Sequence, residues 1–395
     1  MKGLPGALYA FAVTCAAFAG HQKAGAMLQA RRNQSIPEGP FDLWVHVASL
    51  GEYLMAKPLL DTAQKAQLRV LVSFFSTSGA EIAQGNEAHF AFLPFDRAKA
   101  VDAFLTRVQP RQVLFIKYDL WPALVSGLQR RAIPYSVAFA QVQSASTRLK
   151  SWNFLERSMW RGAQHVFHQT SESLTLWKEA NFSNGRLSGD GRFDQVGQVE
   201  APEGIKAFTD FRPVLVAGST WQPEEDLLLP LLMRFPELKV ILAPHAISRV
   251  AALESRLPVP SIRWSQFYQT SHSAKEEARV LLVDTLGDLP ALYACGNLGL
   301  VGGAFGPGLH NILEALAHGL PVACGPHVEG HWEAQHPDAP VKLLPAKAEV
   351  EDLAAWIQVR LEKPNLLASE SAQAKAFIAQ HRGASQQVWD VLFGD

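Results

Sequence analysis

Cysteine is scarce in this sequence, with three residues, Cys15, Cys295 and Cys324, among 395. None of them belongs to a CxxC pair or to a Cys/His spacing of the kind that holds zinc. This scarcity argues against a disulfide framework, and we expect buried thiols of a reducing compartment and no metal site. The histidines are scattered, and we expect His165 and His168 to be strand residues and not metal ligands.

An excess of either charge is also missing. Lys and Arg number 36 against 37 for Asp and Glu, whereas a nucleic-acid-binding protein needs a dominant basic footprint. Disorder is excluded as well, because 48% of the residues are hydrophobic and 22 are Phe. A chain of 395 residues, at roughly 150 residues per domain, predicts more than one core, and we expect two domains.

Charge is absent altogether from residues 4–20. As a helix, these 17 residues would span roughly 26 Å, which is marginally enough for a bilayer core. Lys23, Arg31 and Arg32 follow the segment while only Lys2 precedes it, so the body of the protein would face the cytoplasm. We predict that residues 1–32 are a membrane anchor or a membrane-associated helix. A cleaved signal peptide and a helix packed on the domain remain alternatives.

Short apolar runs recur along the rest of the chain, and most are continuous, not alternating. This pattern is typical of strands buried on both faces of a parallel sheet, with helices such as 53–66 between them. A polar stretch containing Gly and Pro, 196–212, separates two such sets, and 258–277 reads as an irregular connection. The runs are 43–49, 69–76, 90–95, 112–117 and 135–140, then 213–219, 239–244, 280–284, 298–303 and 320–325. The sequence therefore predicts an α/β fold of two doubly wound, Rossmann-like domains, 33–200 and 201–395.

Ligands of such sheets bind beyond the carboxyl ends of the strands. Glu52 in "HVASLGEY", Ser219, Pro244, Asp284 and Gly302 all follow predicted strands. If the two domains face each other, these strand ends would line a central cleft. The sequence alone favours a ligand site built from both halves of the chain.

The most informative segment is "LVGGAFGPGLHNILEALAHGLPVACGPH", residues 300–327. Its glycines allow a close backbone approach, and residues 311–318 have helical spacing. A glycine-rich turn before a helix suits a phosphate, and Glu314 is placed to accept hydrogen bonds from ribose hydroxyls. The spacing matches neither a dinucleotide-binding nor a Walker A motif, so a purely structural strand-turn-helix is the alternative.

Seven sequence blocks occur in the order seen in the 3-deoxy-D-manno-octulosonic acid (Kdo) transferases of lipopolysaccharide synthesis. The chain resembles this family over nearly its whole length, including the N-terminal anchor. The blocks are HVASLGE (46–52), LPFD (93–96), DLWPAL (119–124), GRFD (191–194), GSTWQPEE (218–225), VDTLGDLPALY (283–293) and HNILEALAHGLPVACGPH (310–327).

The resemblance implies an inverting glycosyltransferase of the GT-B type on the cytoplasmic face of the inner membrane. The enzyme would move Kdo from CMP-Kdo to a lipid A precursor of the lipid IVA type without a cofactor or a metal. The family's general base corresponds to Glu52, a carboxylate that the glycine turn would aim at the acceptor hydroxyl. Further catalytic candidates are Lys117, Asp119 and Arg192; the last matches a family lysine, with an exposed interdomain cation as the alternative.

The resemblance also assigns the donor site, where charge develops on the phosphate of the leaving CMP and fixed donors would stabilise it. Ser219 and Thr220 would lie near the phosphate. The other predicted donor-site residues are Pro244, His245, Leu286, Gly287, Asp288, Gly302, Gly303, His310, Asn311, Ile312, Leu313 and Glu314.

Three positions depart from the family pattern. Lys117, Tyr118 and Asp119 replace a common Glu-Thr-Glu, so an acid has become a base. His245 stands where the family has arginine, which removes a permanent cation; a histidine substitutes for it when protonated or as a neutral donor. The family's Asn-Ala-Arg is Ala-Gln-Val at 140–142. These changes leave the scaffold intact but loosen any inference about the acceptor.

Two other functions remain open on the residues alone. One is another GT-B glycosyltransferase, or a sugar-nucleotide epimerase of the same architecture, that uses a UDP-sugar. The other is a membrane-tethered binding protein without catalysis, in which Glu52 merely stabilises a helix N-terminus. The order of the seven blocks favours the Kdo transferase.

Overall fold

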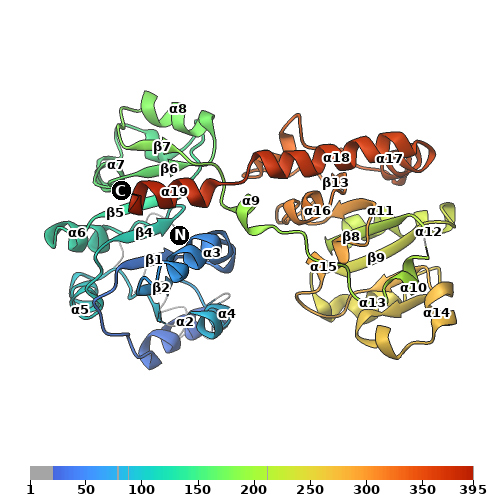
Figure 1. The fold of residues 1–395 in the computed structure, drawn as a ribbon, viewed down its shortest axis with the longest axis horizontal. Coiled ribbons are helices and arrows are strands. Elements are labelled where there is room, and N and C mark those ends of the chain that lie inside the picture. Colours follow the sequence, from blue (N-terminus) through green and yellow to red (C-terminus); the bar gives the residue numbers. More distant parts are fainter. Residues whose placement is uncertain (1–20, 78–79, 88, 211, 395) are drawn as a thin grey trace. The chain divides into compact units, whose positions relative to one another are not determined.

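The computed structural model describes residues 21–77, 80–87, 89–210 and 212–394 (Figure 1). The predicted apolar segment 4–20 therefore lies outside the described residues. The chain divides into two compact units, one formed by residues up to Gln195 together with those from His381 onward, the other by Val196–Gln380. Among the helices that the described residues form, none is both long and apolar enough to cross a membrane.

The first unit is built on seven parallel strands in the order β3-β2-β1-β4-β5-β6-β7. The winding direction changes between β1 and β4, which is the switch point where ligands of such sheets bind. The strands are β1 (Leu43–Val47), β2 (Val70–Phe74), β3 (Phe90–Phe92), β4 (Val113–Ile116), β5 (Tyr135–Ala140), β6 (Val166–His168) and β7 (Gly185–Leu187).

Helices cover both faces of this sheet. Side chains of α5 to α8 complete the core on the Trp44 face, and those of α3, α4 and α19 complete it on the Val45 face. Each such buried side chain contributes about 1.5–3 kcal/mol. The helices are α2 (Gln22–Asn33), α3 (Leu50–Lys65), α4 (Ala80–Asn86), α5 (Ala98–Val108), α6 (Pro122–Arg130), η1 (Thr147–Leu149), α7 (Phe154–Arg161), α8 (Ser171–Glu179), α9 (Arg192–Gln195) and α19 (Ala384–Phe393).

The last helix joins the first unit through Asp194. The carboxylate of Asp194 accepts hydrogen bonds from the backbone N–H groups of Gly383 (2.5 Å) and Ser385 (2.6 Å), at the start of α19. The helix then packs against α3 with Val388 fully buried (Figure 1). The acid of the GRFD block therefore has a structural role.

The second unit repeats the plan with the parallel order β10-β11-β9-β8-β12-β13-β14. Its switch point lies between β8 and β12. The strands are β8 (Val214–Thr220), β9 (Lys239–Pro244), β10 (Ser261–Arg263), β11 (Val280–Leu282), β12 (Leu298–Val301), β13 (Val322–Cys324) and β14 (Val341–Leu343).

Helices also flank this second sheet. Side chains of α11, α12, α13 and α17 complete one core, while α16 packs against α15 and α18. The helices are α10 (Lys206–Thr209), α11 (Gln222–Leu228), α12 (Leu231–Arg234), η2 (Ile247–Arg249), α13 (Val250–Glu254), η3 (Trp264–Gln269), α14 (His272–Glu277), α15 (Leu289–Tyr293), α16 (Leu313–Ala317), η4 (Trp332–Gln335), α17 (Val350–Glu362) and α18 (Pro364–Gln380).

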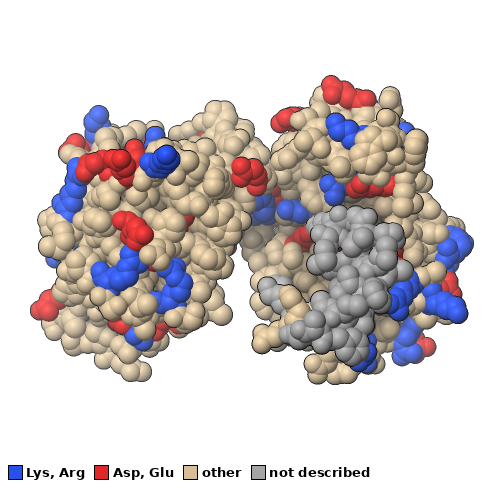
Figure 2. Space-filling model, turned by 180° about the vertical axis from the view of Figure 1, so that it is seen from behind, with Lys and Arg blue, Asp and Glu red and all other residues tan. Residues whose placement is uncertain are grey.

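The predicted fold of two doubly wound, Rossmann-like units is confirmed. The prediction that 258–277 is irregular is wrong, because β10, η3 and α14 fall within it. The predicted helix 311–318 is shorter, Leu313–Ala317. On the face seen in Figure 2, basic and acidic side chains are interspersed on both units, as the balanced composition suggests.

Arg31 is half-buried and is held by contacts within the first unit. Its guanidinium donates hydrogen bonds to the carbonyl oxygens of Leu93 (2.8 Å), Met27 (3.0 Å) and Phe75 (2.5 Å). It also lies over the ring of Phe95, 4.4 Å from the centroid. Arg31 therefore fastens α2 to the loops that follow β2 and β3.

Candidate active site

Glu52 lies in the first turn of α3, directly after β1 and next to the switch point of the first sheet. Its Oε2 accepts a 2.6 Å hydrogen bond from the backbone N–H of Ala48, which fixes the carboxylate against the end of β1. Gly51 lies inside the helix, and a Cβ there would meet nothing within 4 Å. The prediction that a glycine turn aims Glu52 is therefore wrong: the helix start and the Ala48 bond orient it.

The surroundings of Glu52 favour its protonated form. Burial raises the pKa of Glu52 above its ordinary value, and the negative charge of Asp119 adds to the rise. The hydrogen bond from Ala48 is the largest opposing effect, and His46 and Lys117 also lower the pKa. A carboxylate with a raised pKa is a stronger base, which is the property needed to remove a proton from a hydroxyl group.

Asp119, in the loop after β4, is held by two aromatic side chains. Its Oδ2 lies 3.1 Å from Nε2 of His46 and accepts a 3.1 Å hydrogen bond from Nε1 of Trp121. His46 is fully buried, and its Nδ1 lies 2.8 Å from Oγ of Ser73. The same Oγ accepts a 2.7 Å bond from Nε1 of Trp44. His46 belongs to the HVASLGE block, but its position in the sequence indicated no role for it.

Lys117 begins the same loop with a backbone conformation that is uncommon for a residue with a side chain, φ 65°. Its N–H donates to the carbonyl oxygen of Ala138 (2.9 Å), which holds the end of β4 against β5. The adjacent Tyr118 donates its hydroxyl hydrogen to the carbonyl oxygen of Gln141 (2.6 Å). Lys117 and Asp119 thus both lie at the strand edge that carries Glu52.

Arg192 opens α9 and pairs with Asp190. Its Nε and Nη2 donate to Oδ2 of Asp190 at 2.9 and 2.6 Å, and Asp190 is 1% exposed. The side chain of Arg192 is itself only 16% exposed. At Gly191 a Cβ would lie 2.7 Å from the ring of Phe139 and 2.9 Å from the carbonyl oxygen of Met55, so only glycine lets α9 pack this closely on α3.

In the second unit, the predicted residues gather at the carboxyl ends of β8, β9 and β12. Ser219 (φ 52°) and Gly302 are in close backbone contact, because a Cβ at Gly302 would lie 2.2 Å from the Ser219 carbonyl oxygen. Gly303 has φ 95°, and its N–H donates a 2.9 Å hydrogen bond to Oε1 of Glu224. Glycine is required at both positions, one for space and one for conformation.

Two fully buried acids, Glu224 and Glu225, support these loops and were missed by the sequence analysis. Glu224 also accepts a 3.0 Å bond from the N–H of Trp221; burial raises its pKa, and the charge of Glu225 contributes. Glu225 accepts bonds from Arg249 at 2.9 and 2.6 Å. The signal for both was the adjacent pair of acids in the GSTWQPEE block, directly after a strand.

Three aromatic rings form a stack at this edge. The ring of His245 stacks against both Trp221 and His310, with both centroid distances 4.6 Å. Trp221 Nε1 donates a 3.2 Å hydrogen bond to Nε2 of His310. Burial lowers the pKa of His310, and nearby His245 and His331 act in the same direction. His245 and His310 therefore lie side by side, and both were predicted to belong to the binding site of the sugar donor.

The segment leading into α16 is held by its own polar side chains. Asn311 accepts a 3.1 Å bond from the N–H of Leu313 and donates one of 3.1 Å to Oε1 of Glu314, whose pKa is raised by burial. Ile312 and Leu313 are fully buried, so only their main chain is positioned to meet a ligand. Since α16 has five residues, its dipole is smaller than the predicted helix would give.

Three other predicted residues lie in the loop after β11. Leu286 is 83% exposed, Gly287 has φ 93°, and Asp288 accepts a hydrogen bond from the hydroxyl of Thr285. The remaining ones, Thr220 and Pro244, end β8 and β9 and are both buried. Among the described residues, no group of three or more His, Cys, Asp or Glu side chains has the arrangement to hold a metal ion.

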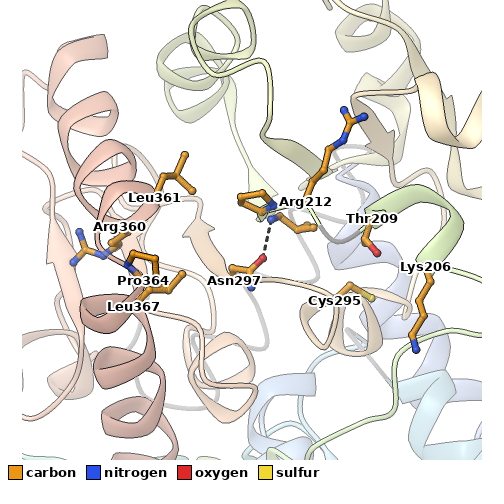
Figure 3. Close-up of a pocket in the computed structure, with 11 residues that line it drawn as sticks. Lys206, Thr209, Arg212, Cys295, Asn297, Arg360, Leu361, Pro364 and Leu367 are labelled. Carbon is orange, nitrogen blue, oxygen red and sulfur yellow. Dashed lines mark hydrogen bonds between the residues drawn. The ribbon is translucent and has the colours of Figure 1, made fainter.

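A pocket of about 410 Å³ in the second unit is not the predicted site. It lies at the opposite, amino end of β8 and β12, where Pro213, Val214 and Asn297 line it together with Leu361 and Leu367 (Figure 3). In Figure 3 the guanidinium groups of Arg212 and Arg360 point away from the centre of the pocket. None of the predicted site residues lines it.

The chain is similar to known proteins over most of its length. A family model described as 3-deoxy-D-manno-octulosonic-acid transferase (kdotransferase) matches residues 19–195. The 3-deoxy-D-manno-octulosonic acid transferase of Bordetella pertussis is 27% identical over 89% of this chain and 86% of its own length. That of Haemophilus influenzae is 26% identical over 91% of this chain and 88% of its own.

Solved structures share the fold at low identity. A UDP-N-acetylglucosamine 2-epimerase superposes with a TM-score of 0.61 at 14% identity, covering 90% of this chain and 96% of its own. MurG of Acinetobacter baumannii gives 0.57 at 13%, covering 89% and 98%. The family match in the first unit, and relatives that span both units, make the chain similar to the 3-deoxy-D-manno-octulosonic acid transferases over most of its length.

Proposed function

We propose that this enzyme transfers Kdo from CMP-Kdo to a hydroxyl group of a lipid A precursor of the lipid IVA type in lipopolysaccharide biosynthesis. The acceptor oxygen attacks the anomeric carbon from the face opposite the phosphate, so the configuration inverts. The new C–O bond takes its electrons from the hydroxyl oxygen, and the pair of the broken bond leaves with CMP. The hydroxyl proton goes to Glu52.

The position and environment of Glu52 carry this proposal. An acceptor hydroxyl is a poor nucleophile, and a carboxylate whose pKa is raised by burial removes its proton more readily than an exposed one. The Ala48 N–H fixes Oε2, so the carboxylate is oriented before the substrate binds. The switch point of a doubly wound sheet is where such a reacting group is expected.

The donor side of the reaction rests on the strand ends of the second unit. Charge develops on the phosphate of CMP as it leaves, and groups fixed beforehand stabilise it best. The backbone at Ser219 closely approaches the backbone at Gly302 there. Buried Glu224 holds this geometry by accepting a hydrogen bond from the N–H of Gly303. We assign the phosphate to these loops and to His245, without a metal ion or another cofactor.

We also propose that the acceptor is reached at the cytoplasmic face of the inner membrane. The loop and helix after β5 expose three large apolar side chains in a run of four positions: Trp152 at 66%, Phe154 at 77% and Leu155 at 63%. Lys150 and Arg161, which flank them, are exposed as well. Exposed aromatic rings between basic residues suit a surface of anionic lipid.

The decisive experiment measures transfer by purified protein, with CMP-Kdo generated in place and a tetra-acylated lipid A precursor as the acceptor. Mass spectrometry reads the product. Wild-type protein should add Kdo, and Glu52→Gln should reduce the transfer rate by a factor of about 100 or more, within the range for loss of a general base. CMP binding, measured by calorimetry, should be unchanged in the variant.

A matched control is Glu172→Gln. Glu172 also lies in the first turn of a helix that follows a strand of the first unit, α8, but it is exposed. This variant should transfer Kdo at the wild-type rate. Equal activity of Glu52→Gln and wild type would refute the base assignment, and tight binding of UDP without any response to CMP would refute the donor. Activity that EDTA abolishes would contradict the metal-free mechanism.

A further inference from the structure

Four side chains form a buried hydrogen-bonded chain that ends beside Glu52. Trp44 and His46 of β1 point to the same face of the sheet, because side chains two residues apart share a face. Both reach Oγ of Ser73 on the neighbouring strand β2, at 2.7 and 2.8 Å. His46 then extends to Asp119 with its other ring nitrogen, 3.1 Å away. The chain thus links the centre of the sheet to the loop after β4.

The partners of His46 determine its tautomer. Trp44 Nε1 is a donor only, so Ser73 Oγ accepts from it, and the hydroxyl hydrogen of Ser73 is directed to Nδ1 of His46. The remaining hydrogen of a neutral imidazole then lies on Nε2 and points at Asp119. In this arrangement every polar group of the four side chains has a hydrogen-bond partner, as buried polar groups require.

Asp119 therefore receives two N–H donors on one oxygen, from His46 and Trp121. Donors favour the charged form of a carboxylate, so these two contacts favour the charged form of Asp119. Glu52 accepts a single backbone N–H, and the charge of Asp119 disfavours a second charge nearby. Two acids with unlike surroundings divide the roles of proton acceptor and fixed charge.

We propose that His46 is a positioning residue, which holds Asp119 charged and in place so that the proton from the acceptor hydroxyl goes to Glu52. His46 itself touches no substrate and acts through Asp119. The inference rests on the proposed function, since it concerns the base of that reaction. The titratable and charged groups that interact with Glu52 are His46, Lys117, Tyr118 and Asp119, while Asp190 and Arg192 lie at α9, which packs against α3.

The test is a cycle of variants read by the pH dependence of the transfer rate. Activity requires ionised Glu52, so the rate falls as the pH drops through its pKa. Asp119→Asn removes the neighbouring charge and should move this acid limb to lower pH. His46→Ala should lower kcat by about 10- to 100-fold, the effect of losing a hydrogen bond to a charged group, and its acid limb should lie at lower pH than that of His46→Gln, which loses the same ring but keeps a donor to Asp119. KM for CMP-Kdo should change little.

The double variant separates positioning from a merely structural role. If His46 acts through Asp119, adding His46→Ala to Asp119→Asn should cause no further loss of kcat, whereas independent effects would multiply. His46→Gln should recover most of the rate, because its amide N–H donates to Asp119. Multiplying losses, or equal acid limbs in His46→Ala and His46→Gln, would overturn the proposal.

A matched control measures the general cost of removing a buried histidine. His168 on β6 is equally buried and lies 2.8 Å from a serine, Ser173 Oγ, but it has no acidic partner. His168→Gln should lower stability without moving the acid limb. If His46→Ala does not fold, the comparison of His46→Gln with His168→Gln, both checked for thermal unfolding, decides the question.

A substrate-free readout keeps this test apart from the proposed function. In protein with ¹³C-labelled glutamate carboxyl groups, the Glu52 signal is identified as the one missing from Glu52→Gln and is titrated by NMR. Its pKa should fall in Asp119→Asn and should be lower in His46→Ala than in His46→Gln, since both variants lose the direct effect of the imidazole on Glu52. If these pKa shifts are observed but the wild type transfers no Kdo, the proposed function is refuted and the positioning role of His46 is retained. If the wild type transfers Kdo but the pKa of Glu52 does not shift, only the positioning role is refuted.

Discussion

Nε1 of Trp221 lies 3.2 Å from Nε2 of His310, and both rings stack against that of His245. Indole nitrogen is a donor only, so His310 accepts and its Nε2 carries no hydrogen. The lowered pKa of His310 keeps the ring in this form at neutral pH. The stack is therefore held by a bond that depends on neutral histidine.

We expect Trp221→Phe, which retains a ring and removes the N–H, to weaken CMP binding by about fivefold to tenfold, as the loss of one hydrogen bond predicts. Calorimetry with CMP measures this. The control is Trp356→Phe in the same unit, because the indole nitrogen of Trp356 is buried without a hydrogen-bond partner. Equal affinities of the two variants would show that the stack does not shape the nucleotide site.

Replacing Gly302 should disrupt the second unit locally. The added Cβ in Gly302→Ala would lie 2.2 Å from the carbonyl oxygen of Ser219, so backbone has to move, which costs about 1–3 kcal/mol. We expect lower thermal stability and loss of CMP binding. Gly306→Ala, in the same loop, meets nothing within 4 Å and should behave like wild type. A stable, CMP-binding Gly302→Ala protein would argue against the close approach of these loops.

Acid should destabilise the first unit through His168. Burial lowers the pKa of His168 to about 4, against about 6.5 in an unfolded chain. Because the folded-state pKa is lowered, the stabilisation is complete above about pH 6.5 and is lost as the pH falls toward 4, up to about 3 kcal/mol. As the pH is lowered between these values, the midpoint temperature of thermal unfolding should fall less steeply for His168→Gln than for wild type. Parallel curves would contradict this.

Membrane contact should depend on the exposed side chains after β5. Trp152→Ser with Phe154→Ser should reduce binding to anionic vesicles by about tenfold or more. Burial of each aromatic ring in the lipid contributes about 1.5–3 kcal/mol to binding, and the double variant loses this contribution. Vesicle co-sedimentation measures this. The control pair, Met233→Ser with Tyr268→Ser, removes two side chains of the second unit that are each 66% exposed. If the control pair binds the vesicles as weakly as the test pair, the loss of binding is not specific to the side chains after β5.

The long buried strands were predictable because their residues are apolar on both faces. β5 and β9 match the predicted runs 135–140 and 239–244 at both ends. The three-residue strand β10 was missed: Ser261, Ile262 and Arg263 are only partly buried at the edge of the sheet, so no apolar run marks them. A short edge strand is specified by its neighbour and not by its own composition.

The candidate site was predictable to a similar extent. Residues directly after strands, such as Glu52 and Ser219, were found because the carboxyl edge of a parallel sheet is a general ligand position. His46 and Glu224 were missed, because one lies within a strand and the other within a helix. Their partners, Asp119 and the N–H of Gly303, are 73 and 79 positions away, and only the folded chain brings them together.

The dependence of α19 on Asp194 bears on how the protein is made and dissected. The first unit acquires α19 from residues that follow the second unit, so a ribosome must complete the second unit before the first can close over α3. A fragment that stops at Gln195 would leave apolar surface on α3 uncovered. Isolating that half calls for a short linker that joins Gln195 to His381, in place of simple truncation.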